Sequence, residues 1–386
     1  MRITIVTGFF LPVPPLRGGS TEKIWHRLAG EFARAGHAVT FVSRRWPGLP
    51  DRETSAGVTH IRIPGTDHSR SLAANLWHDL RWGLRVARVL PPGDAVICNT
   101  VTLPVWLRAV KPAAGKVVAV LARMPKGHGR AYGRVDLLLA LSARVAEQLK
   151  AENAALAPRL APFPYPIDYE LHVRARRQAA PAGPTLTIGY VGRIHPDKGI
   201  RQLVAACAAL VGHRGLPDWR LELTGPWAVP EGGGGEAFRT ELEREFGGIL
   251  GPRLRFAGPE FDPARLADRY AALDLFCYPS RDRGETFGVA VAEAMAARTA
   301  VVVSNLPCFA ELVNPGRTGL VYDHEAPDAE TRLAHRLALL LQDSALRAEL
   351  ADAAQSHVAR YDYAASARDI LATLARCTGP NPGPGI

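Results

Sequence analysis

The amino-acid sequence predicts an α/β fold made of two doubly wound domains. Short apolar runs alternate with amphipathic segments through the first half of the chain, and a second series of the same kind fills the other half. A stretch rich in Pro, Ala and Gly at 179–184 separates the two series. With 386 residues the chain is too long for one small core, so two domains are expected. The alternation itself is typical of parallel sheets with helices on both faces.

The first series, residues 1–178, predicts an N-terminal domain. Its clearest helix is expected over 20–35, where Ile24, Leu28 and Phe32 recur at helical spacing. The apolar runs that we expect to form its strands are residues 3–7, 39–42, 59–63, 95–98, 117–121 and 137–141.

The second series, residues 185–360, predicts a C-terminal domain. Its expected strands are residues 186–191, 220–223, 253–257, 275–278, 300–303 and 319–322, and its clearest helices are residues 200–210, 264–271 and 289–296. The glycine run within 231–236 predicts a flexible surface loop. A helix over 361–377 and a frayed tail over 378–386 complete the chain.

Positive charge is concentrated in the first half. Residues 1–178 carry 26 Lys and Arg against 12 Asp and Glu, a net charge of +14, whereas the remainder carries 21 against 25, a net charge of −4. A basic half can face nucleic acid, an anionic membrane surface or an acidic acceptor. Because no helix-turn-helix, zinc finger or aromatic-rich motif accompanies it, we favour the membrane surface or the acceptor and expect no nucleic-acid partner. High Arg with high Ala and Pro is also what a GC-rich genome produces.

Two further features predict a cytoplasmic protein that can associate peripherally with the inner membrane face. No apolar run approaches the roughly 20 residues that span a bilayer, and the N-terminus reads as a buried strand rather than a signal peptide. The five cysteines are dispersed without CxxC or Cys/His spacing, which indicates reduced thiols and no structural zinc.

Two glutamates eight residues apart form the most informative motif. Glu285 is expected in a loop and Glu293 in the apolar helix that follows it. At about 100° per residue, eight residues end about 80° past two full turns, so both carboxylates can face one side. Thr286 is a candidate N-cap, which would leave the amides of Thr286, Phe287 and Gly288 at the positive end of the helix dipole. The arrangement suits a sugar attached to a phosphate; ordinary dipole compensation and core packing are the alternative.

A basic loop follows the strand at 186–191. Gly192 opens it, and Arg193 and Lys198 stand five residues apart before the next helix. Arg193 offers a planar fork of donors and Lys198 a point charge, which together can neutralise a diphosphate. The alternative is a solvated basic loop.

Glycines mark two other positions where a ligand could approach the backbone. Gly18 and Gly19 lie between the first strand and the first helix, and Gly225 lies at the end of the strand at 220–223. Backbone amides beside such glycines are accessible to a phosphate, and the carboxyl ends of parallel strands are where α/β folds bind ligands. Each signal alone is weak.

Several common motifs are absent. The sequence has no GxGxxG after a strand, no P-loop, no GxSxG elbow and no Asp-x-Asp pair that would grip a metal on a nucleotide diphosphate. We therefore expect charge compensation by Arg193, Lys198 and a helix N-terminus, without a metal or cofactor.

Taken together, these residues resemble the retaining glycosyltransferases of family 4, which have the GT-B fold. The similarity covers nearly the whole chain. The matching stretches are GG at 18–19, GHAVTFVS at 36–43, LLALSARVAEQL at 138–149, GRIHPDKG at 192–199, GETFGVAVAEAMA at 284–296 and NPGRTGLVYD at 314–323. The resemblance implies two Rossmann-like domains that face a central cleft.

The resemblance also implies roles in binding a nucleotide-sugar donor. Glu293 would accept hydrogen bonds from the ribose, and Glu285 would hold hydroxyls of the donor sugar. Arg193 and Lys198 would bind the diphosphate and stabilise it as the leaving group.

For the N-terminal domain, the resemblance implies an acceptor side. Gly18 and Gly19 would close over the phosphates, and the helix at 361–377 would return to this domain. Many relatives carry a His just after the strand equivalent to 117–121, but the matching place here is Ala122. Arg123, Lys126 and His128 are the candidates for that space.

The leading hypothesis is a retaining transferase that moves a hexose from a UDP- or GDP-linked sugar to an acceptor hydroxyl. The acceptor would be a saccharide or a lipid-linked molecule in bacterial cell-surface polysaccharide, lipopolysaccharide or glycolipid synthesis. The absence of the His motivates one alternative, a catalytically weak nucleotide-sugar-binding protein that acts as a partner subunit. A nucleic-acid-binding protein is the third reading.

Overall fold

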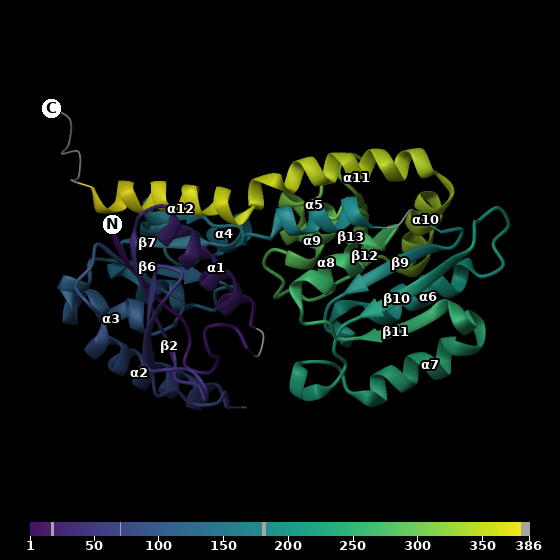
Figure 1. The fold of residues 1–386 in the computed structure, drawn as a ribbon. Helices are drawn as coiled ribbons and strands as arrows, with labels where there is room; N and C mark the ends of the chain where they lie inside the picture. Colours follow the sequence, from purple (N-terminus) through teal and green to yellow (C-terminus); the bar gives the residue numbers. More distant parts are fainter. Residues whose placement is uncertain (17–18, 70, 180–182, 380–386) are drawn as a thin grey trace. The chain divides into compact units, whose positions relative to one another are not determined.

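The computed structural model describes residues 1–16, 19–69, 71–179 and 183–379 (Figure 1). The chain forms two compact units. The first contains Met1–Pro166 together with Tyr363–Ile386, and the second contains Ile167–Asp362.

Unit 1 is built on an eight-stranded sheet with the order β3-β4-β2-β1-β5-β6-β7-β8. All its strand pairs are parallel except β3 with β4. The strands are β1 Arg2–Val6, β2 Ala38–Arg44, β3 Arg52–Ser55, β4 Val58–Ile63, β5 Ala95–Cys98, β6 Lys116–Leu121, β7 Leu137–Ala140 and β8 Leu160–Pro162. Its α-helices are α1 Ser20–Arg34, α2 Leu72–Val89, α3 Leu103–Val110, α4 Ala143–Glu152 and α12 Tyr363–Thr378, with 3-10 turns η1 Pro112–Ala114, η2 His128–Arg134 and η3 Ala154–Arg159.

Unit 2 is built on a six-stranded, all-parallel sheet with the order β11-β10-β9-β12-β13-β14. The strands are β9 Leu186–Val191, β10 Trp219–Thr224, β11 Leu254–Gly258, β12 Leu275–Tyr278, β13 Ala300–Ser304 and β14 Leu320–Tyr322. Its α-helices are α5 Tyr169–Gln178, α6 Ile200–Leu210, α7 Glu236–Leu250, α8 Pro263–Ala271, α9 Val289–Ala296, α10 Ala329–Gln342 and α11 Ser344–Val358. Its 3-10 turns are η4 Pro196–Lys198, η5 Val229–Glu231, η6 Gly251–Arg253, η7 Pro307–Glu311 and η8 Ala359–Tyr361.

The strand order reverses once in each sheet, beside β1 in unit 1 and beside β9 in unit 2. In open α/β sheets ligands bind outside the carboxyl ends of the strands at such a reversal. The loop after β9 is the basic loop that the sequence singles out, so the fold places it where this rule predicts a ligand.

The unit boundary falls one helix earlier than the sequence predicts. The expected N-terminal domain ends at 178, but α5 belongs to unit 2 because Ala175 packs with Ala267 and Ala271 of α8. Arg176 adds a hydrogen bond from Nη1 to the Ala271 carbonyl at 2.6 Å. Of the linker predicted at 179–184, residues 180–182 lie outside the described part of the chain.

The C-terminal helix α12 belongs to unit 1. It contacts α1, where the Arg27 guanidinium lies 5.2 Å from the centre of the Tyr363 ring. The described residues end at Gly379, so residues 380–386 of the predicted tail lie outside them. Among the described helices, none combines the length and apolar character that crossing a membrane would require.

A buried histidine in unit 1 predicts that stability falls in acid. His60 on β4 is 2% exposed and its ring lies 5.9 Å from that of His26. Burial, with the nearby Arg62 guanidinium, lowers the pKa of His60 to about 4. The unfolded chain therefore takes up this proton at a higher pH than the folded chain, so stability is complete above the ordinary pKa of about 6.5 and declines as the pH falls toward 4.

We expect urea titrations to show a loss of about 3 kcal/mol in the free energy of unfolding across this pH range. His60→Phe should flatten that slope, because a phenyl ring fits beside Phe41 and carries no proton to take up. The exposed residue His213 provides the matched control, and His213→Phe should leave the slope unchanged. An unaltered slope in His60→Phe would show that other groups cause the acid sensitivity.

Candidate active site

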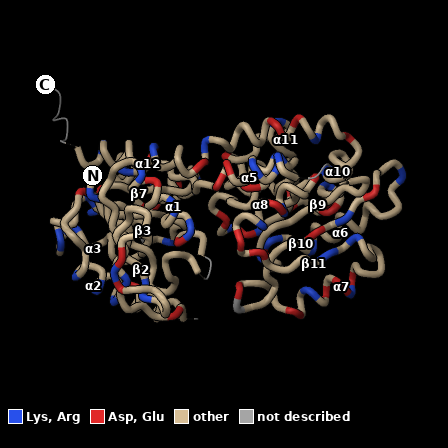
Figure 2. The backbone as a smooth tube through the Cα atoms, viewed as in Figure 1, with Lys and Arg blue, Asp and Glu red and all other residues tan. Residues whose placement is uncertain are grey.

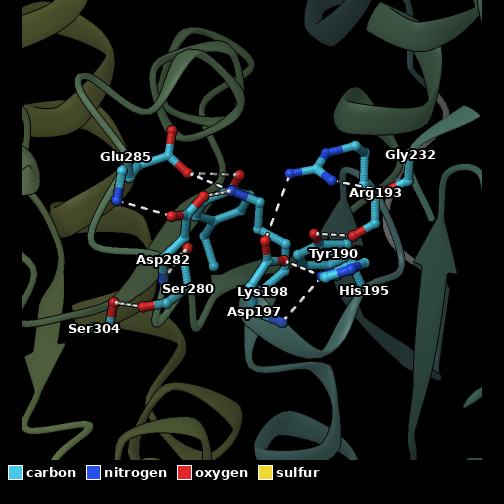
Figure 3. A network of polar contacts seen from close by, with 12 residues as sticks. Tyr190, Arg193, His195, Asp197, Lys198, Gly232, Ser280, Asp282, Glu285 and Ser304 are labelled. Carbon is cyan, nitrogen blue, oxygen red and sulfur yellow. Dashed lines mark hydrogen bonds and ion pairs between the residues drawn. The ribbon is translucent and has the colours of Figure 1, made fainter. Parts of the chain in front are cut away.

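Two loops of unit 2 meet at the carboxyl ends of β9 and β12 (Figure 3). The first is the basic loop 192–199, and the second is the loop 279–288, which carries Asp282 and Glu285. Gly199 has φ +68°, and a Cβ there would lie 2.1 Å from the Pro279 carbonyl oxygen, so the two backbones approach closely. The Arg281 amide also donates to the Asp197 carbonyl at 2.9 Å. These contacts bring the predicted cations and the predicted Glu285 into one site.

Lys198 lies between two carboxylates. Its Nζ is 2.9 Å from Oε2 of Glu285 and 3.0 Å from Oδ2 of Asp282, and its side chain is only 8% exposed. Burial by itself would lower the pKa of Lys198, but Glu285 and Asp282 outweigh burial and raise it above the ordinary value. Tyr278 donates a further hydrogen bond to Oε2 of Glu285 at 3.3 Å. Lys198 therefore stays protonated, and both carboxylates pair with its ammonium group.

Asp282 is a site residue that the sequence analysis missed. Burial would raise the pKa of Asp282, but the Gly284 amide and the Lys198 ammonium together lower it, so the carboxylate stays charged. The signal that could have found it is its place three residues before Glu285 in a loop that follows a buried strand.

Arg193 lies in the same network but has different partners. Its Nη1 donates to the Gly232 carbonyl at 2.6 Å, and its Nη2 lies 3.8 Å from Asp197. With its side chain 41% exposed, the guanidinium keeps donors available to a ligand. Lys198 and Arg193 are therefore both held near the same edge of the sheet, although neither contacts the other.

The glycine run after β10 is not the flexible surface loop that its composition predicts. Gly234 donates to the Ile194 carbonyl at 2.9 Å, and Gly235 donates to the Trp227 carbonyl at 2.7 Å. A Cβ at Gly232 would lie 3.0 Å from Cδ of Arg193. The glycines allow this loop to lie directly against the basic loop, which positions the Arg193 side chain.

Gly192 and Gly225 let the ends of β9 and β10 pack closely. Gly225 has φ +145°, and a Cβ there would lie 1.8 Å from the Gly192 carbonyl oxygen. Both amides already donate, Gly192 to Thr224 at 2.9 Å and Gly225 to Gly258 at 2.9 Å. In this structure their role is to shape the loops, and a ligand contact at either position stays a prediction.

The start of α9 differs from the prediction. Thr286 is not the N-cap; Gly288 is, with φ +95° and no side-chain cap. The chain enters the helix through a left-handed turn that packs against Phe309, and a Cβ at Gly288 would lie 2.7 Å from that ring. Thr286 is buried, and Phe287 packs edge-on against Tyr361 with ring centres 5.3 Å apart. The Phe287 side chain is engaged in this packing. If Thr286, Phe287 and Gly288 contact a ligand, we therefore expect the contacts to come from their backbone amides.

Glu293 is buried in α9, 8% exposed, and accepts a hydrogen bond from the Tyr270 hydroxyl at 3.1 Å. Burial and then the Glu293 carboxylate raise the pKa of Tyr270 well above its ordinary value, so the phenol is a fixed donor. Tyr270 and Tyr278 each lie within about 6 Å of Phe276, at 5.7 and 6.1 Å between ring centres. The two predicted glutamates are thus each held by a tyrosine of one aromatic row.

Unit 1 contains the other predicted residues. Gly18 lies outside the described residues. Gly19 has φ +91° and precedes α1, and a Cβ there would lie 2.3 Å from Oε2 of Glu22. Burial raises the pKa of Glu22 more than its own amide lowers it. Ala122 follows β6 and is half-buried, with Arg123 exposed beside it.

The described part of the chain contains no group of three or more His, Cys, Asp or Glu side chains arranged to hold a metal ion. The site at β9 and β12 instead offers two cations, Lys198 and Arg193, with carboxylates on both sides. An arrangement of this kind can bind a phosphate group and hydroxyl groups together.

A test of the loop contact uses two glycines with similar backbone angles. Gly199→Ala should cost about 3 kcal/mol of unfolding free energy, because the left-handed backbone and the clash with Pro279 act together. Gly212 has φ +77°, but no atom lies within 4 Å of an added Cβ. Gly212→Ala should therefore cost about 1 kcal/mol of unfolding free energy. Equal losses in urea titrations would show that the approach of the two loops does not matter for stability.

Solved structures share the fold of the two units. A glycosyltransferase from Rickettsia africae matches the structure with a TM-score of 0.76 at 16% identity, covering 98% of this chain and 100% of that one. Anabaena Alr3699/HepE, solved in complex with UDP and glucose, matches with a TM-score of 0.71 at 18% identity, covering 97% and 99% of the two chains. At such identities the likeness concerns the fold, and the predicted α/β fold of the GT-B type, with two Rossmann-like domains, is confirmed.

The sequence comparisons then give the family. Residues 174–357 match the family model described as Glycosyl transferases group 1. The phosphatidyl-myo-inositol mannosyltransferase of Mycobacterium tuberculosis is 30% identical over 98% of this chain and 98% of its own length. The chain belongs to the glycosyl transferases group 1 family. The predicted resemblance and the predicted transfer of a sugar are thereby confirmed.

Proposed function

We propose that this glycosyltransferase moves a hexose from a nucleotide diphosphate sugar to an acceptor hydroxyl, with retained anomeric configuration and without a metal ion. The observation that carries the proposal is the cluster of Lys198, Asp282 and Glu285 at the carboxyl ends of β9 and β12. In that cluster one cation already holds the carboxylate that would bind the donor sugar.

The cluster suits the binding of a diphosphate. Phosphate oxygens can replace the carboxylates around Lys198, and Arg193 has donors that are still exposed to solvent. Once Lys198 contacts phosphate, Glu285 is available to accept hydrogen bonds from sugar hydroxyls. Glu293, held by Tyr270, would accept hydrogen bonds from the ribose.

The same groups would stabilise the transition state of transfer. The bond between the anomeric carbon and the phosphate oxygen breaks, and the acceptor oxygen forms its bond on the same face of the sugar. A leaving-group oxygen receives the acceptor proton, so the chain needs no nucleophile of its own. Lys198 and Arg193 stabilise negative charge as it develops on the departing diphosphate.

The comparisons favour particular substrate classes. One fold relative was solved with UDP and glucose, and a sequence relative that matches over 98% of both chains is named phosphatidyl-myo-inositol mannosyltransferase. We propose a UDP- or GDP-linked hexose as donor and a saccharide or lipid-linked acceptor in bacterial cell-surface polysaccharide or glycolipid synthesis. The net charge of +14 over residues 1–178 suits an acceptor with a phosphate group. We propose that the reaction takes place in the cytoplasm.

One observation favours a second candidate. Ala122 stands where many relatives of family 4 carry a His, so the protein could bind a nucleotide sugar and transfer it poorly, as a partner subunit. This candidate predicts donor binding without turnover.

A donor screen separates the candidates. At a concentration of about 100 times its dissociation constant, the cognate UDP- or GDP-hexose should stabilise the fold by about 2.7 kcal/mol and raise the melting temperature by several degrees. We then expect release of the nucleotide diphosphate with and without EDTA, and a product with the donor's anomeric configuration by NMR. Binding without any release would favour the partner subunit. Loss of activity in EDTA would contradict metal independence, and an inverted product would contradict retention.

A further inference from the structure

A large cavity lies in unit 1, at the amino ends of the strands. It has a volume of about 820 Å³ and is lined by residues that begin or precede β6, β7 and β8, together with residues of α3 and α12. Because these three strands are parallel, their amino ends meet at one edge of the sheet. The lining residues belong to unit 1, whereas Lys198 and Glu285 belong to unit 2, so the cavity is not part of the candidate active site.

Positive charge dominates the walls of this cavity. The described residues that line it include five cationic side chains and one carboxylate, that of Asp136, which leaves a net charge of +4. The cations come from α3, β6, the turns η2 and η3, and α12, and they are Arg108, Lys116, Arg134, Arg159 and Arg376. Figure 2 shows segments of Lys and Arg in blue around α3.

The carboxylate of Asp136 anchors two of these cations. Nη1 of Arg108 donates to both of its oxygens at 2.5 Å, and Nζ of Lys116 lies 3.4 Å from Oδ1. Asp136 is 12% exposed and also accepts a hydrogen bond from the Val117 amide at 2.9 Å, which ties it to β6. Arg108 and Lys116 are still 46% and 38% exposed, so each keeps donors for a ligand.

The other three cations have no carboxylate partner in the part of the chain that the structure describes. Nη1 of Arg159 donates to the carbonyls of Gly133 and Val135 at 2.6 and 3.1 Å. Arg376 donates to a threonine hydroxyl of its own helix at 3.0 Å, and Arg134 is exposed at the end of η2. Carbonyl and hydroxyl groups hold a guanidinium without neutralising it. An anion that enters the cavity therefore meets arginines that are partly positioned and uncompensated, which lowers the entropy cost of binding.

We propose that this cavity is an accessory anion site, which binds a small soluble molecule that carries two or more phosphate groups. Four of the five cations are arginines, whose planar forks fit two phosphate oxygens at once. One phosphate group, with a charge of about −2, would compensate only half of the charge of +4. The volume lies within the range of roughly 300–1,000 Å³ that is usual for small-molecule sites. The proposal goes beyond hexose transfer, because the residues proposed to bind the nucleotide sugar do not line this cavity.

Cys377 provides a local readout of binding. It lines the cavity and is half-buried, whereas the four other cysteines are buried, so N-ethylmaleimide should modify Cys377 first in the folded protein. The rate is followed by mass spectrometry of the peptide that contains it. Inorganic pyrophosphate at about ten times its dissociation constant should slow the reaction about tenfold, because only the unoccupied protein then reacts. At equal ionic strength, orthophosphate should protect less and tripolyphosphate more.

A double variant tests the arginines that do not support the fold of the strand ends. Arg134→Glu with Arg376→Glu should weaken pyrophosphate binding about 100-fold or more, because each lost charge-assisted hydrogen bond costs about tenfold or more. The matched control is Arg52→Glu with Arg336→Glu, which makes the same change in charge at two exposed sites outside the cavity and should be protected as wild type is. Lys198→Ala should also be protected as wild type is, which excludes binding at the candidate active site as the cause.

The outcomes separate failure of this inference from failure of the proposed function. The proposal is overturned if pyrophosphate protects the Arg134 and Arg376 variant as well as wild type, or no better than sodium chloride of the same ionic strength. Protection by single-stranded RNA or by anionic vesicles, with none by pyrophosphate, would also overturn it, because the surface would then serve a macromolecule or a bilayer. Hydrolysis of the nucleotide sugar should be the same in wild type and in this variant. If pyrophosphate protects Cys377 as expected but no donor turns over, the anion site stands and the enzymatic proposal fails.

Discussion

Lys198→Ala should reduce the rate of hexose transfer by about 10²–10³-fold, the size of effect that follows removal of one group that stabilises transition-state charge. In the structure the ammonium contacts Glu285 and Asp282 at 2.9 and 3.0 Å and is almost fully buried. With donor bound, it would contact the departing diphosphate, so its removal should lower kcat more than it raises KM. Initial rates at saturating donor measure the effect.

The variant must be separated from a merely unstable protein. Removing Lys198 leaves two carboxylates facing each other in a poorly solvated place, which also costs stability. Lys198→Ala with Glu285→Gln should regain part of the lost stability but none of the lost rate, because the repulsion falls while the cation is still missing. Arg283→Ala is the loop control, since its side chain is 81% exposed and pairs with Glu325 on the surface. If Lys198→Ala kept its rate within a few-fold of wild type, the role in charge stabilisation would be wrong.

Most of the strands could be predicted from the sequence because parallel strands are buried on both faces. Runs such as the one that forms β9 are rich in apolar residues and buried at every position, so they stand out from helical patterns. The same reasoning missed β3 and β8. β3 is a polar edge strand with exposed side chains, and β8 has only three residues and ends in a proline. Neither carries the apolar signal on which the prediction depends.

The structure brings the predicted residues Lys198 and Glu285 into contact and adds Asp282, which the sequence analysis did not name; that this place binds a ligand stays a prediction. The position of the basic loop after β9 follows from the order strand, loop, helix, which the sequence displays. The ion pair between Lys198 and Glu285 joins residues 87 positions apart, and no local pattern records such a pair. The packing of the glycine run against Arg193 is also a long-range contact, so composition alone predicted a flexible loop there.

The errors at the ends of helices have local causes. A threonine before an apolar helix is a common N-cap, but the left-handed turn at Gly288 begins α9 two residues later. The assignment of α5 to the N-terminal domain was wrong for a different reason. A Pro- and Gly-rich stretch is a common domain boundary, yet the helix before it buries its apolar face on α8. Tertiary packing decides both cases.

Glu293→Ala should raise the dissociation constant of the donor about 10- to 100-fold and change kcat much less, because a hydrogen bond to a charged group contributes about 1.5–3 kcal/mol. Titration calorimetry with the cognate donor measures the change. Tyr270→Phe is the informative companion variant, since it removes the hydroxyl that donates to Glu293 at 3.1 Å and keeps the carboxylate. It should weaken donor binding by a smaller factor, because Glu293 then loses orientation but not its charge.

The role of Glu293 as a partner of the ribose can be tested on the ligand as well as on the protein. A donor that lacks the ribose hydroxyl in contact with Glu293 should bind wild type more weakly than the natural donor does. The Glu293→Ala variant should bind this donor no more weakly than it binds the natural donor. The two losses would then be non-additive, as for two partners of one hydrogen bond. Additive losses with both the 2′-deoxy and the 3′-deoxy donor would mean that Glu293 acts on the fold of α9 through Tyr270. In that case its burial beside the aromatic row, at 8% exposure, would be its whole function.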